Sequence, residues 1–159
     1  VKENLFQYPT ERMISNIARV CLKRFQETDN TELIALVATG SSEEAKQACL
    51  FIMMKYYKLV WDFMITVIGE KYRTKNFTFT KMDLNSFFTR LQEQNDVVAS
   101  WSDSTIAKSK QVLKKILVEN RYLNNSKTET LNPVLLDFTL KDIIENMNQS
   151  EALIAFNCL

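Results

Sequence analysis

The sequence predicts an all-α fold, a compact helical bundle with helix-turn-helix-like parts and a small β-wing. The 159 residues include only two glycines and two prolines, too few for the many tight turns of a β-rich fold. Apolar residues recur at helical spacing, and capping signals precede several of these stretches. The length and the 46% hydrophobic content fit one globular unit. We divide it into an N-terminal helical part, residues 1–76, and a C-terminal winged-helix-like part, residues 77–159.

The first two helices are expected at residues 10–26 and 31–38. The first is amphipathic and begins after Pro9, whereas the second is closed by Gly40. The chain starts with Val1 and has no initiator methionine. We therefore expect a fragment of a longer protein.

A long helical region is expected from residue 42 to about residue 74. Ser41 and Glu44 form a capping box at its start. Apolar residues surround this region on too many sides for one surface helix, which predicts a break near Lys58. Residues 48–68 are the most apolar stretch, yet two lysines and an aspartate lie in its middle, and each is costly at a bilayer centre. The stretch therefore predicts a buried helix and no contact with a membrane.

The C-terminal part begins with an extended link at residues 77–79. Thr80 and Asp83 then form a second capping box for a helix over residues 81–94. A connector that is longer than a tight helix turn leads to a further helix over residues 103–120, with Ser102 or Asp103 as its cap.

A small β-hairpin is expected next. Residues 121–123 and 128–131 flank a polar turn at residues 124–127. A last helix is expected over residues 140–147. The order helix, turn, helix and wing is that of a winged helix-turn-helix, whose second helix enters the DNA major groove while the wing contacts the backbone.

The residue inventory argues against an enzyme. The chain has no histidine, which removes the commonest general base, the usual partner of a nucleophilic serine or cysteine, and most catalytic zinc sites. The three cysteines contain no CxxC pair, so they indicate neither a metal site nor a disulfide framework, and they fit a reduced compartment. We expect no catalytic residue, no metal, no cofactor, no small-molecule substrate and a cytoplasmic location.

Charge is unevenly distributed, although the formal net charge is only +1. Residues 1–28 contain five basic and three acidic residues, and residues 101–127 contain six and two. Residues 128–159 contain one basic and five acidic residues. The near-neutral total therefore conceals two basic helical regions and an acidic C-terminus, and it does not exclude a nucleic-acid-binding face.

Two of the expected helices carry polar stripes with the spacing i, i+4, i+7, i+11, which places the side chains on one face. In the first helix, Arg24 interrupts the apolar side opposite the stripe. In the helix over residues 103–120, an apolar seam is expected to be buried, and it consists of Ile106, Val112, Leu113, Ile116 and Leu117. The two polar surfaces are Arg12, Asn16, Arg19 and Lys23 on the first helix, and Ser104, Lys108, Gln111, Lys114 and Lys115 on the second.

Three interpretations of these stripes remain open. Arginine and lysine side chains pair with DNA phosphates, while arginine, asparagine and glutamine also contact base edges. Any surface helix also exposes polar residues at this spacing, and an acidic protein partner would suit the same surface. Lys127, at the tip of the expected hairpin, is equally a phosphate contact or an ordinary exposed turn lysine.

The sequence resembles the BrxA family. The stretch Trp101-Ser-Asp-Ser-Thr105 and the Ile116-Leu-Val-Glu119 that ends the following helix are similar to the family's signature segment. Further similar segments are residues 4–10 before an arginine-containing helix, Ala45-Lys-Gln-Ala48, Asp62-Phe63 and Leu131-Asn-Pro133, so that the resemblance covers roughly residues 3–145.

The resemblance implies a role in BREX (bacteriophage exclusion), a bacterial phage-defence system. It implies a small accessory component that binds double-stranded DNA, with other phage-defence proteins as partners. Because lysines dominate the polar surfaces and a lysine acts mainly as a point charge, we expect low sequence specificity. The alternative is a scaffold or adaptor subunit of the same complex that does not contact DNA. Family members carry a few tens more residues before the equivalent of Val1, so the helix over residues 10–26 would be the second half of a helix-turn-helix.

Overall fold

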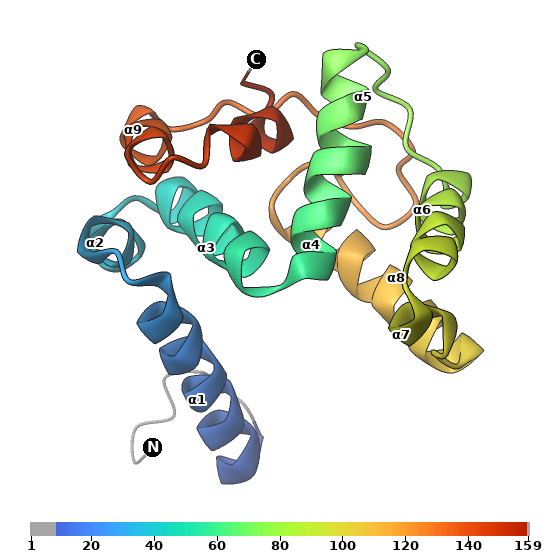
Figure 1. Ribbon diagram of the computed structural model, residues 1–159. Coiled ribbons are helices and arrows are strands. Elements are labelled where there is room, and N and C mark those ends of the chain that lie inside the picture. Colours follow the sequence, from blue (N-terminus) through green and yellow to red (C-terminus); the bar gives the residue numbers. More distant parts are fainter. Residues whose placement is uncertain (1–8, 159) are drawn as a thin grey trace.

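The computed structural model describes residues 9–158, and helices make up most of them (Figure 1). The predicted all-α fold is confirmed. Residues 4–8, which carry part of the family resemblance, lie outside the described residues. The helices are α1 Glu11–Thr28, α2 Thr31–Thr39, α3 Ser42–Tyr56, α4 Lys58–Phe63, a π-helical segment Met64–Gly69, α5 Glu70–Arg73, α6 Lys81–Gln94, α7 Asp96–Ala99, α8 Asp103–Glu119, α9 Phe138–Asn146 and a 3-10 helix Ser150–Phe156.

Side-chain caps start the helices where the sequence predicts them. At the start of α3, the Ser41 hydroxyl accepts a hydrogen bond from the backbone N–H of Glu44, whose carboxylate accepts one from the Ser41 backbone. This capping box satisfies two backbone donors that have no partner inside the helix. The predicted caps form at Thr10, Ser41, Thr80 and Ser102.

The long apolar region breaks at Tyr57, next to the predicted Lys58. Tyr57 is extended, with φ −115° and ψ 105°, so α4 leaves α3 at an angle. From there α4, the π-helical segment and α5 continue as one rod through the centre of the molecule (Figure 1). The π-helical segment ends at Gly69, where a Cβ would lie 2.7 Å from Cγ2 of Ile154 in the 3-10 helix. Only glycine allows these two segments to approach so closely.

The predicted β-hairpin, the proposed wing, does not form in the described residues. Thr130 pairs in an antiparallel bridge with Thr78 of the extended link instead. The backbone N–H of Phe79 donates to the carbonyl of Glu129, and that of Leu131 donates to the carbonyl of Phe77, both at 2.7 Å. Local turn signals favoured a hairpin, but in the pairing that forms the side chains of Phe79 and Leu131 beside the bridge are buried, which removes apolar surface from water.

Aromatic side chains connect the rod to the C-terminal half. The ring of Phe63 lies edge-on to that of Phe79, at 6.2 Å between centroids, and to that of Phe87, at 5.3 Å. The hydroxyl of Tyr72 donates to the carbonyl of Asn132 at 2.6 Å, which ties the rod to the long loop after α8. Burial raises the pKa of Tyr72, so this hydroxyl keeps its proton.

The C-terminal segment also packs against the N-terminal helices. The side chain of Gln47 in α3 donates to the carbonyl of Leu135 at 2.8 Å and accepts from the N–H of Asp137 at 3.0 Å. Helix α9 lies against α2 and α3, and the 3-10 helix lies against the π-helical segment. The division into residues 1–76 and 77–159 stays a prediction, and these contacts cross it.

Helix α1 projects from the body of the molecule (Figure 1). Of its 18 residues, only Ile14 and Thr28 are buried. The apolar stretch 48–68, in contrast, lies in the core for much of its length. In residues 9–158, no helix combines the length with the apolar character that crossing a bilayer requires.

Candidate nucleic-acid interface and the groove beside it

The α1 basic stripe, which consists of Arg12, Asn16, Arg19 and Lys23, is exposed along its whole length. The Nζ atom of Lys23 is 3.9 Å from a carboxylate oxygen of Glu27 and lies over the ring of Tyr56. A hydrogen bond with that tyrosine raises the pKa of Lys23, so its positive charge is retained. Among the described residues, Arg12 and Arg19 take part in no ion pair. Their guanidinium groups are therefore available to an anionic ligand.

The polar stripe of α8 is exposed at Ser104, Lys108, Gln111 and Lys115, and Lys114 beside it is half-buried. Its two edges border different hollows: Gln111 and Lys114 line the one beside α6, and Ser104 and Lys108 line the one toward α4. Lys115 pairs with Glu119 of its own helix at 3.4 Å.

The structure brings a lysine from α6 into the neighbourhood of α8, which sequence reasoning missed. Lys81, the first residue of α6, lines the same shallow hollow as Lys110 and Lys114, and we call these three the α6–α8 lysine cluster. Lys110 donates to the side chain of Asn85 at 2.9 Å and lies 5.6 Å above the centroid of the Phe88 ring. A search for spacing within one helix cannot find a cluster that spans two helices, although the Thr80 cap did place Lys81 at a helix start.

Lys127 is exposed in the loop between α8 and the bridge, and no hairpin presents it. The side chain of Asn125 organises this loop by accepting from the backbone N–H of Lys127 at 2.8 Å. Beside the loop, Arg121 pairs with Glu43 of α3 at 3.1 Å. The loop thus presents Lys127 to solvent on a turn that its own asparagine stabilises.

The prediction that the whole apolar seam of α8 is buried is wrong for one residue, Val112. Val112 is 45% exposed, whereas Ile106, Leu113, Ile116 and Leu117 are buried as predicted. The helical wheel puts Val112 at the edge of the seam, and among residues 9–158 no neighbouring helix covers that edge of α8. Val112 instead lines an open groove.

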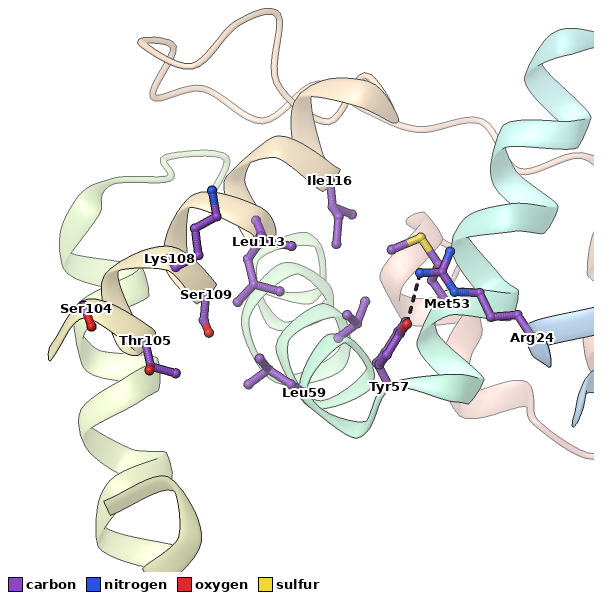
Figure 2. A pocket seen from close by; sticks show the side chains of 12 residues that line it. Arg24, Met53, Tyr57, Leu59, Ser104, Thr105, Lys108, Ser109, Leu113 and Ile116 are labelled. Carbon is purple, nitrogen blue, oxygen red and sulfur yellow. Dashed lines mark hydrogen bonds between the residues drawn. The ribbon is translucent and has the colours of Figure 1, made fainter. Parts of the chain in front are cut away.

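This groove, which we call the α1–α8 groove, has a volume of about 550 Å³. Figure 2 shows its two sides: α8 with Ser104, Thr105 and Lys108, and α1 with Arg24, with Leu59 and Tyr57 between them. The surface that lines it is mainly apolar, and none of the described acidic side chains contributes to it. The full lining is Arg24, Met53, Tyr57, Leu59, Val60, Ser104, Thr105, Lys108, Ser109, Val112, Leu113 and Ile116.

Arg24 is held at one side of the groove by Tyr57. One terminal guanidinium nitrogen donates to the Tyr57 hydroxyl at 3.1 Å, and the guanidinium carbon lies 5.0 Å from the centroid of the ring. The Nε atom is buried and has no acceptor among the described residues. A buried guanidinium N–H without an acceptor is costly, so the contact with Tyr57 must compensate for it.

A partly buried ion pair between α5 and α6 has a structural role. Lys71 in α5 pairs with Asp83 of α6 at 2.7 Å, and it also donates to the carbonyl of Thr78. Burial alone would raise the pKa of the Asp83 carboxyl, but the hydrogen bond from Lys71 and those from Thr80 outweigh it and lower the pKa. The pair joins the rod to the start of α6 and so positions Lys81.

Comparison of the sequence with known proteins identifies the BrxA family. The sequence profile of BrxA matches residues 1–148. A Bacillus cereus (strain H3081.97) protein named "BREX protein BrxA" is 39% identical over 127 residues, which are 80% of this chain and 63% of that protein. A protein of the same name from Paramagnetospirillum magneticum is 26% identical over 77% of this chain and 62% of its own length. The chain thus spans less than two thirds of these two relatives.

Two further similarities extend over nearly the whole chain. A "BREX protein BrxA" from Escherichia coli O9:H4 is 25% identical over 95% of this chain and 70% of that protein. The crystal structure of an uncharacterized protein from Magnetospirillum magneticum superposes with a TM-score of 0.78 at 24% identity. It covers 97% of this chain and 78% of that one. The superposition shows that the two chains share a fold.

Proposed function

Because this chain belongs to the BrxA family, we propose that it is an accessory component of a BREX phage-defence system that binds double-stranded DNA and catalyses no reaction itself. The observation that carries the DNA-binding part is the α1 basic stripe. Its cationic side chains lie on one exposed face of a projecting helix, and two of its arginines have no ion-pair partner in the described residues. Such a face releases counterions when it neutralises phosphates.

The α6–α8 lysine cluster supports a second contact. Helices α6, α7 and α8 follow one another in the order of a helix-turn-helix, with α8 in the place of the recognition helix. Gln111, Lys114 and Lys115 lie on α8, and Lys81 of α6 adds a charge close to them. Lys127, in the loop after α8, is available to a backbone phosphate even without a hairpin.

We expect low sequence specificity from this surface. Lysines supply most of its charge, and a lysine ammonium acts as a point charge that does not select between bases. Contacts to phosphates fix the position of a protein on the duplex but carry no sequence information. Asn16 and Gln111 are the two side chains of the set that are suited to base edges.

A salt titration of binding to a random-sequence duplex tests the proposal. Binding measured by fluorescence anisotropy should weaken steeply between about 50 and 200 mM salt. Replacing both arginines of the stripe, Arg12→Gln with Arg19→Gln, should lower the slope of log K against log salt by about 0.9 for each phosphate that the variant no longer neutralises. Lys141→Gln, on α9, is the matched control and should leave the slope unchanged.

Two results would contradict the proposal. If the duplex shows no binding at low salt, the scaffold function without DNA contact becomes the better explanation. If binding occurs but the double arginine variant keeps the full slope, the α1 basic stripe is not the interface. In that case Lys81→Gln with Lys114→Gln shows whether the α6–α8 lysine cluster carries it.

A further inference from the structure

We propose that the α1–α8 groove is the docking site for an amphipathic helix of a partner protein, whose apolar face fills the groove and whose carboxylate binds Arg24. This inference does not rest on DNA binding, since it concerns a different face of α1. The occupant is defined by its chemistry: a helix of about three turns with an apolar stripe and an aspartate or glutamate on the same side.

The length of the groove fits a helix. Its α8 wall is a continuous stripe of successive turns that runs from Ser104 to Ile116. At a rise of 1.5 Å per residue this stripe is about 18 Å long, which matches three turns of a partner helix. Grooves between packed helices commonly bind such helices through anchors at positions i, i+3 or i+4, and i+7.

An apolar face of α1 leads to Arg24, the residue of α1 that lines the groove. Met13, Ile17, Val20 and Arg24 have the spacing i, i+4, i+7, i+11, so they share one face of α1. Met13 is 42% exposed and Val20 is 39% exposed, and both lie on the stripe that leads to Arg24. In the groove itself, Val112 is exposed to a similar degree. Apolar side chains in the groove and on the face of α1 that carries Arg24 thus face solvent and would gain from burial against a partner.

The charges determine which helix fits. Arg24 and Lys108 are the two charged residues that line the groove, and both are cationic. The described residues place no carboxylate within ion-pair distance of Arg24, whose terminal nitrogen donates to the neutral hydroxyl of Tyr57. A carboxylate on the partner would accept from this guanidinium, and hydrogen bonds of this charge-assisted type are among the stronger ones in proteins.

The same surface is poorly suited to DNA. Protein–DNA interfaces are polar and strongly positive, because phosphates lie along the whole contact. The groove has two cations and a floor of Leu59, Val60 and Leu113, which offer nothing to a phosphate. The α1 basic stripe is centred roughly 100° away around the helix from Arg24, at 100° per residue. A duplex on the stripe would leave the groove open.

A phage-displayed library of helix-forming peptides, selected on the whole chain, tests the proposal even though the partner is unidentified. Enriched peptides should carry apolar residues at helical spacing together with an aspartate or glutamate. For a synthetic peptide of this class, Arg24→Glu should weaken binding about tenfold or more, because a charge-assisted hydrogen bond is replaced by repulsion. Exchanging the acidic residue of the peptide for lysine should restore binding to that variant, which a merely structural role of Arg24 would not produce.

A pair of exposed valines supplies the matched control. Val112→Asp places a charge in the groove and should weaken peptide binding, whereas Val97→Asp, on the exposed side of α7, should not. Circular dichroism confirms that each variant is folded. The Arg12→Gln, Arg19→Gln variant should bind the peptide normally, so failure of the DNA proposal and failure of this one are distinguishable.

Three outcomes would overturn the inference. The library could enrich no helix-forming sequence, or it could enrich peptides that bind Val112→Asp as well as the native chain. Alternatively, duplex DNA could displace the peptide and lose affinity for the Val112→Asp variant. The last result would make the groove part of the nucleic-acid surface.

Discussion

Gly69→Ala should destabilise the protein, although alanine is the better helix former. A Cβ at position 69 would lie 2.7 Å from Cγ2 and 3.1 Å from Cγ1 of Ile154. Ordinary carbon–carbon contacts are about 3.5–4.0 Å, so the new methyl group would overlap the isoleucine by about 1 Å. The β-branched side chain of Ile154 has few alternative rotamers, which limits its escape.

The magnitude follows from two opposing effects. Overpacking of this kind lowers the free energy of unfolding by about 1–3 kcal/mol. Replacing glycine with alanine inside a helix raises it by about 1 kcal/mol. A net loss of up to about 2 kcal/mol is expected. In a domain of this size each kcal/mol shifts Tm by about 2–4 °C, so Tm should fall by up to roughly 8 °C in a calorimetric scan.

The neighbouring side chain provides the control. In an Ile154→Ala background both γ carbons are absent, so the same Gly69→Ala change should be neutral or stabilising by up to about 1 kcal/mol. If Gly69→Ala lowers Tm equally in both backgrounds, the contact between the π-helical segment and the 3-10 helix is not the cause. The reasoning about close approach would then be refuted.

Three further predictions concern stability. The Lys71 partner keeps the pKa of Asp83 below its unfolded value, so the stability it contributes is present above the unfolded pKa and lost as pH falls through the lower folded pKa. The fall of Tm with acid should therefore be shallower in Asp83→Asn, and an unchanged profile would show that this pair does not contribute. Ser41→Ala should cost about 1 kcal/mol in urea unfolding by removing the cap of α3, whereas no loss would mean that the capping box is redundant. Val112→Lys should change the unfolding free energy by less than about 0.5 kcal/mol and Leu113→Ala by about 2–5 kcal/mol, and similar losses at the two positions would contradict their assigned burial.

The helices were predictable because their signals are local. Ser41 with Glu44 defines a helix start within four residues, and the same holds for Thr80 with Asp83. The break beside Lys58 followed from an apolar surface too wide for one helix. The bridge between Thr78 and Thr130 was not predictable, because the two partners are far apart in sequence and local turn signals favoured a different pairing.

The candidate site was predictable to the extent that it lies on single helices. The exposure of Arg12 and Arg19 follows from the periodicity of α1 alone. The position of Lys81 beside Lys110 depends on how α6 and α8 pack, and the exposure of Val112 depends on the absence of a neighbour on one side of α8. Periodicity identifies which residues share a face, but it does not identify what lies opposite that face.

Helix α1 illustrates how the two proposed contacts can share one helix. A projecting helix with two buried residues has most of its circumference free, so it can offer different faces to different partners. Arg12 and Arg19 lie on the basic face, while Met13 and Val20 lie on the face that leads to Arg24. These faces differ in chemistry, one polar and cationic and the other apolar with a single half-buried guanidinium. A charge change on the first should therefore affect a salt-dependent contact, and a polar substitution on the second should affect a contact that is driven by apolar burial.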